Sequence, residues 1–172
     1  MKRASLSWLL LAVLHGQTPA RKEIDAYNEQ RKILQKKAQA SFDREMAREK
    51  TQDYGGSTVD LNNCLSDALK AATANYQSYA GALRAILAQR SPWPDFLKPG
   101  PTGVPLTQTE LIADFDQLQA AWEKYRDAMC VGAAGLVKSG TAWRSYDYRC
   151  RLMVLDDHMR VLATFYSALL MK

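Results

Sequence analysis

The chain has 172 residues, of which 23 are Lys or Arg and 18 are Asp or Glu, so its net charge at neutral pH is +5. This length is typical of a single globular domain with a short leader. The basic residues are scattered along the chain and match no fold signature of a nucleic-acid binder, which argues against binding of DNA or RNA.

Residues 1–20 have the composition of a secretory signal peptide. Two basic residues precede an apolar run at residues 8–14, and small and polar residues follow as far as Ala20. The run is too short to cross a bilayer, and no second apolar segment of that kind follows. We therefore expect a periplasmic or secreted protein without a membrane span after cleavage, which would occur after Gly16 or after Ala20. Removal of residues 1–20 takes away two basic residues and leaves a net charge of +3.

Residues 21–53 contain no Gly or Pro and are rich in good helix formers, so they predict a helix. Its apolar positions are sparse: Ile24, Tyr27, Ile33, Leu34, Ala38, Phe42 and Met46. Such a weak stripe predicts partial docking at best, and we favour a loosely packed, charged leader over residues 21–56 rather than a coiled-coil partner site. A Gly-Gly-Ser-Thr sequence at residues 55–58 ends the segment.

Three further segments repeat apolar residues every three or four positions, the spacing of helices with one buried face. We predict helices over residues 60–89, over residues 107–138 and from residue 142 onward. The expected core face of the first is Leu61, Leu65, Ala68, Leu69, Ala72, Tyr76, Tyr79, Leu83 and Ile86. That of the second is Leu111, Phe115, Leu118, Trp122, Tyr125, Met129, Gly132 and Leu136. That of the third is Tyr148, Leu152, Leu155, Met159, Leu162, Tyr166 and Leu169.

Helices with single apolar faces bury them economically against one another in a bundle. The predicted fold class is therefore all-α. It consists of an antiparallel three-helix bundle over residues 57–172, with an additional charged helix at the N-terminus. We find no segment with a comparable β-strand pattern.

A proline-rich loop at residues 91–106 interrupts the helices, since proline suits neither a helix interior nor an inner strand. It places Trp93, Phe96 and Leu97 between prolines. Loops often carry the residues that bind a partner, and prolines can hold such residues in place at a low entropy cost. These three residues are therefore candidates for binding a protein partner. The alternative, to which we give equal weight, is that Trp93 and Phe96 cover one end of the bundle.

Three cysteines in an exported chain predict one disulfide and one free thiol. In an antiparallel bundle Cys64, Cys130 and Cys150 all lie at the same end. Cys130 and Cys150 are each ten residues from Gly140, which places them at one level of a helical hairpin. A bridge needs close Cα atoms, so we favour this pairing over one between Cys64 and either of the others.

The sequence offers little for catalysis or metal binding. His158 is the one histidine after the expected signal peptide, which argues against a zinc site, and no cofactor is expected. We expect His158 at the surface or boundary of its helix, with Asp156 and Asp157 pointing in other directions. The remaining acidic candidates lie along an expected helix exterior, so we predict that the protein is not an enzyme: Glu110, Asp114, Asp116, Glu123 and Asp127.

The cluster formed by Trp122, Tyr125, Arg126 and Asp127 combines aromatic and charged residues on one helix. Trp122 and Arg126 are four residues apart and so are neighbours on the helix surface. Their side chains can form a cation–π contact, or the arginine can pair with a carboxylate of another helix. We favour a role in holding the fold together over direct contact with a partner.

Three short sequence motifs resemble those of the LprI-like family of bacterial envelope proteins, which is named after a lysozyme inhibitor. They are Asp-Leu-Asn-Asn-Cys at residues 60–64, Ala-Trp-Glu-Lys-Tyr-Arg-Asp-Ala-Met-Cys at residues 121–130, and Cys-Arg-Leu at residues 150–152. The resemblance implies a helical, exported, disulfide-bearing domain that inhibits a cell-wall hydrolase such as lysozyme. The alternative is a structural or interaction module that binds an envelope component without inhibiting anything.

Overall fold

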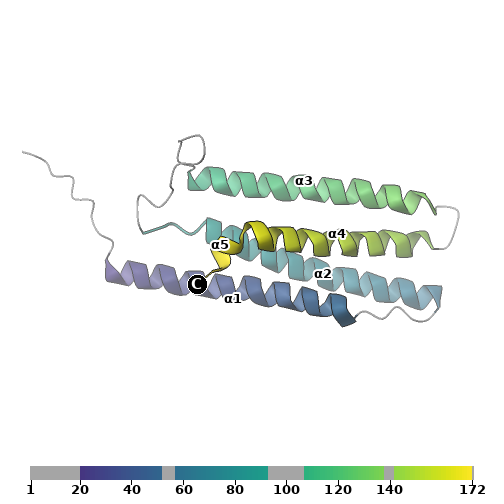
Figure 1. Cartoon of the computed structure of the whole chain (residues 1–172), viewed down its shortest axis with the longest axis horizontal. Helices are drawn as coiled ribbons and strands as arrows, with labels where there is room; N and C mark the ends of the chain where they lie inside the picture. Colours follow the sequence, from purple (N-terminus) through teal and green to yellow (C-terminus); the bar gives the residue numbers. More distant parts are fainter. Residues whose placement is uncertain (1–19, 52–56, 93–106, 138–141, 172) are drawn as a thin grey trace, which may run out of the picture.

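The computed structural model describes residues 20–51, 57–92, 107–137 and 142–171. They form four long helices, α1 (Arg21–Thr51), α2 (Thr58–Leu87), α3 (Gln108–Gly135) and α4 (Trp143–Phe165), and a single turn, α5 (Ser167–Leu170). Successive long helices run in opposite directions, and α1 and α3 lie on opposite sides of α2 and α4 (Figure 1). The described residues contain no strand. The predicted all-α, antiparallel architecture is confirmed.

Two helices begin at capping boxes. Ser57 Oγ accepts a hydrogen bond from the Asp60 backbone N–H at 3.3 Å, while Asp60 accepts one from the Ser57 backbone N–H at 3.3 Å. Thr107 and Glu110 make the same reciprocal pair at the start of α3, at 3.2 and 2.7 Å. These bonds satisfy N–H groups that have no partner within the helix, so each box fixes the residue at which its helix starts.

The core lies between α2 and α4. Large, fully buried side chains come from both helices, among them Leu65, Tyr79, Leu83, Leu155 and Met159. The predicted core faces of these two helices are confirmed, because their other members are buried or half-buried.

The charged N-terminal helix is not loosely packed, and this part of the prediction is wrong. α1 makes extensive contact with α2, and Ala38, Ser41 and Glu45 are fully buried. Ser41 Oγ donates to Ser78 Oγ of α2 at 2.9 Å. A small residue and two hydrogen-bonded polar residues form this interface, so a search for large apolar side chains overlooks it.

The predicted core face of α3 is wrong for five of its eight members, Gly132 among them. Phe115 and Trp122 are buried, but Leu118, Tyr125, Met129 and Leu136 are exposed. The face that meets the bundle instead runs through Phe115, Gln119, Trp122, Arg126, Cys130 and Ala134. Gln119 and Arg126 are polar, so hydropathy favours the neighbouring stripe, which faces solvent.

The tight packing of α1 gives a testable prediction. Ala38→Lys places a long charged side chain in the α1–α2 interface and should lower the free energy of unfolding by about 3 kcal/mol, because a buried charge would lack a partner. Ala40→Lys, two residues on and exposed, makes the same change in helix propensity without burial and should be nearly neutral. Urea unfolding followed by circular dichroism measures both. Equal stability of the two variants would contradict the packing of α1.

Candidate functional site

An aromatic cluster joins three helices near the middle of the bundle. The Trp122 ring of α3 stacks on the His158 ring of α4, with centroids 4.1 Å apart and planes at 6°. The Tyr76 ring of α2 lies 4.9 Å from that of Trp122 at a tilt of 51°. The Arg126 guanidinium lies over Trp122, 5.0 Å from the ring centroid. Trp122 and Arg126 therefore contribute to helix packing, the first directly and the second through a cation–π contact.

His158 is buried, and the prediction that it lies at a surface or boundary is wrong. Its Nε2 is 3.0 Å from Gln119 Oε1, which also accepts a 2.6 Å hydrogen bond from the Tyr76 hydroxyl. Because an amide oxygen only accepts, His158 donates from Nε2. Burial lowers the pKa of His158 to about 4, so the ring is neutral near pH 7. The prediction failed because α4 packs against three helices, α1, α2 and α3. Residues beside its apolar stripe, such as His158, are therefore buried as well as the stripe itself.

A second set of motif residues joins α3 to α4. Asp127 accepts hydrogen bonds from Arg126 Nε at 3.0 Å and from Arg151 Nη1 of α4 at 2.6 Å. Arg151 also donates from Nε to both carboxylate oxygens of Asp147 at 3.0 Å. The hydrogen bond from Arg151 is the main cause that holds the pKa of Asp127 below its usual value. Tyr125 is the exception in the motif, because its side chain is exposed.

Cys130 and Cys150 form a disulfide with Cα atoms 5.4 Å apart, while Cys64 is a free, exposed thiol. The bridge closes a segment of 20 residues that contains the α3–α4 turn. Together with Asp127 and Arg151 it fixes α3 against the N-terminal half of α4. Trp93, Phe96 and Leu97 lie outside the described residues, so their role in partner binding remains a prediction.

Replacement of the disulfide should cost stability. A bridge that closes a loop of this length contributes about 3 kcal/mol, chiefly by restricting the unfolded chain. The double variant Cys130→Ser/Cys150→Ser should lose roughly that amount in chemical unfolding. Cys64→Ser removes the free thiol and should leave the midpoint unchanged, which makes it the matched control. A larger loss from Cys64→Ser than from the double variant would contradict the pairing.

A buried polar network, absent from the sequence predictions, joins α1, α2 and α4. Arg48 donates from Nε to Glu45 at 2.6 Å and from Nη2 to both carboxylate oxygens of Asp156 at 3.1 Å. Asn75 of α2 donates to Glu45 at 2.8 Å. Glu45 and Asp156 are both buried and share a side-chain hydrogen bond. In the sequence, Glu45 and Arg48 are two of the many charged residues in the helix predicted over residues 21–53.

Two carboxyl groups can share a hydrogen bond only when one of them holds a proton. Burial, followed by the contact with Glu45, raises the pKa of Asp156 to about 7. Burial opposes ionisation of Glu45 as well, yet hydrogen bonds from Arg48, Asp156 and Asn75 lower its pKa below the usual value. Asp156 is therefore the protonated partner. One turn further along α4, Arg160 forms an ion pair with Glu49 of α1 at the surface.

The raised pKa of Asp156 gives a prediction with a definite sign. Between the unfolded value of 3.8 and the folded value of about 7, the native state holds a proton that the unfolded chain lacks. The stability that Asp156 contributes is therefore lost as the pH rises towards 7 and beyond. Asp156→Asn mimics the protonated group, so its free energy of unfolding relative to wild type should increase between about pH 5 and about pH 8.

Asp116→Asn is the control for this pH series. Asp116 is exposed, and its hydrogen bond from Arg84 lowers its pKa, so it stays ionised throughout that range. Its free energy difference from wild type should not change with pH. A constant difference for Asp156→Asn would contradict a shared proton.

None of these clusters has the geometry of an accessible catalytic site. The Glu45–Asp156 pair is closed to solvent, and the acidic residues of α3 that the sequence suggested are exposed. Within the described residues, no group of three His, Cys, Asp or Glu side chains could hold a metal ion. No helix of the described ranges has the length and apolar character to cross a membrane.

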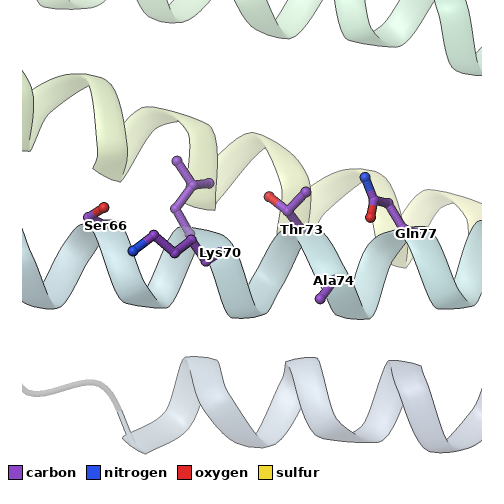
Figure 2. A pocket seen from close by; sticks show the side chains of 6 residues that line it. Ser66, Lys70, Thr73, Ala74 and Gln77 are labelled. Atoms are coloured by element: carbon purple, nitrogen blue, oxygen red, sulfur yellow. The ribbon is translucent and has the colours of Figure 1, made fainter.

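A shallow groove of about 400 Å³ runs along α2 (Figure 2). A single helix lines it, with Ser66, Leu69, Lys70, Thr73, Ala74 and Gln77. Its one charged group, Lys70, is paired with Asp67 at 2.9 Å. No other element contributes a side chain to the groove, so no set of groups converges on a ligand there.

The family model described as Lysozyme inhibitor LprI matches residues 48–162. The chain belongs to this family. The match begins in the last turn of α1 and covers α2, α3 and nearly all of α4. It therefore includes the disulfide, the aromatic cluster and the Asp127–Arg151 pair, and it confirms the resemblance seen in the sequence. No curated protein and no solved structure matches the chain.

Proposed function

We propose that the protein binds a lysozyme or a related cell-wall hydrolase and inhibits it by covering its substrate cleft. The observation that carries this proposal is the match to the lysozyme inhibitor family over residues 48–162. That range contains the contacts that hold α2, α3 and α4 together, so the match extends over these three packed helices as well as the motif.

The proposed setting is the periplasm or the outside of the cell. A disulfide persists in an oxidising compartment, and the family is that of an inhibitor of an extracellular enzyme. The signal peptide predicted for residues 1–20 would direct export. Those residues, apart from Ala20, lie outside the described ranges, and the signal peptide remains a prediction.

Inhibition by occlusion requires a rigid surface and no chemistry by the inhibitor itself. A surface that is already ordered before binding loses little conformational entropy in the complex, which favours affinity. The α3–α4 hairpin supplies such a surface, because the Cys130–Cys150 disulfide and the Asp127–Arg151 ion pair hold its two helices together.

The alternative is an interaction module without inhibitory activity, with the charged N-terminal helix as its docking element. This proposal has weaker support. The side of α1 that carries Ala38, Ser41 and Glu45 is already buried within the chain. A partner would have to recognise the remaining, charged side of that helix.

The test is titration of lysozyme with the purified mature protein. We expect cell-wall lysis, measured by turbidity, to fall in proportion to the complex detected by calorimetry. An inert protein of similar size and charge controls for non-specific effects on the turbid substrate. Binding with full retained activity would support the interaction module instead. Full activity with no complex at a large excess of the protein would contradict inhibition of that lysozyme.

A further inference from the structure

Exposed apolar side chains are concentrated on one half of the bundle. Among the described residues, four large exposed hydrophobic residues belong to α3, a fifth is its C-cap residue, and five belong to α4, whereas α1 and α2 have one each. Those of α3 are Leu118, Tyr125, Met129 and Val131, with Leu136 at its C-cap, and those of α4 are Trp143, Tyr146, Met153, Val161 and Phe165. Single exposed hydrophobic residues are ordinary, but a concentration on two adjacent helices is typical of an interaction surface.

Three residues of α3 and its C-cap residue, Leu136, share one side of the helix. Leu118, Tyr125, Met129 and Leu136 follow at intervals of seven, four and seven residues, which are close to whole numbers of helical turns. Their exposed fractions are 43%, 58%, 38% and 88%. The stripe is about 27 Å long at 1.5 Å per residue, which is enough to lie along an extended groove of another protein. We call these four residues the outer stripe of α3.

The charge on α3 indicates what kind of partner the outer stripe suits. α3 carries five acidic and two basic residues, a net charge of −3, whereas α1 has a net charge of +3 and α4 of +1. Arg84 pairs with Asp116, and Arg151 pairs with Asp127. Asp114 and Glu123 have no ion-pair partner among the described residues. Asp114 lies one turn before Leu118 and so beside the stripe.

We propose that the outer stripe of α3 is the surface that contacts a basic lysozyme, an inference that rests on the proposed function. Common lysozymes are basic, and a domain with a positive net charge does not attract them at long range. The acidic α3 provides local attraction and would orient the encounter towards its own side of the bundle. Tyr125 lies near the middle of the stripe and has the size and amphipathic character of a binding anchor.

This assignment also accounts for Tyr125 within the family motif. Trp122, Arg126 and Asp127 each contact other side chains of the bundle, whereas the Tyr125 side chain projects to solvent. Three of the four motif residues fix α3 in place, and the fourth is presented by the helix that they fix.

The experiment compares single variants of the mature protein for lysozyme affinity by calorimetry and for inhibition. Tyr125→Ala and Leu118→Lys should each weaken binding by roughly 30-fold, the loss expected for an interface anchor. Ile33→Lys, on α1 and 57% exposed, is matched in exposure and should stay within about twofold of wild type. Asp114→Lys should slow association and make it less sensitive to salt. Thermal unfolding verifies that each variant is folded.

The outcomes separate this inference from the function on which it rests. Absence of a complex with the wild-type protein overturns both. Normal wild-type inhibition that is unchanged in Tyr125→Ala and Leu118→Lys overturns only the assignment of the surface. Light scattering covers a third outcome, in which a second copy of the chain occupies the stripe. A wild-type dimer that Leu118→Lys dissociates without change in lysozyme affinity also overturns the assignment.

Discussion

Two buried polar residues of α4 impose the arrangement of the other helices. Asp156 and His158 are two positions apart, so their side chains leave the helix about 200° apart. A buried polar group is costly unless it has a hydrogen-bond partner. Asp156 is hydrogen-bonded to Arg48 and Glu45 of α1, and His158 is hydrogen-bonded to Gln119 of α3. α4 can therefore be buried only with α1 on one side and α3 on the other.

The contacts around α3 explain why an apolar stripe of this helix remains in solvent. Trp122 stacks on His158, Asp127 pairs with Arg151, and Cys130 is bonded to Cys150. These three contacts fix the rotation of α3 about its own axis. With that rotation fixed, the outer stripe cannot turn inward, even though its residues are more apolar than the Gln119 and Arg126 that face the bundle. Specific contacts thus override the hydrophobic pattern, and the exposed stripe is available for another molecule.

The boundary of the family match has a structural counterpart. The match begins at residue 48, and Arg48 is the residue of α1 that pairs with Asp156. Most of α1 precedes the match, yet this preceding part contributes the buried Ala38, Ser41 and Glu45. Glu45 adds a second carboxyl group beside the Arg48–Asp156 pair. Because Glu45 and Asp156 share a proton, the two acids together carry one negative charge, which the single arginine balances. The N-terminal helix is therefore integrated through polar contacts with the matched domain.

The sequence by itself determined the helices, their antiparallel order, the core faces of α2 and α4, and the family, because these depend on local spacing and on short motifs. It also favoured the Cys130–Cys150 pairing, because distance from a turn sets the level of a residue in a hairpin. Only the tertiary structure decided the rotation of α3, the burial of His158 and the docking of α1. Each of these depends on polar partners from distant segments, such as Gln119 for His158 and Asn75 for Glu45. Hydrophobic periodicity carries no information about such pairs.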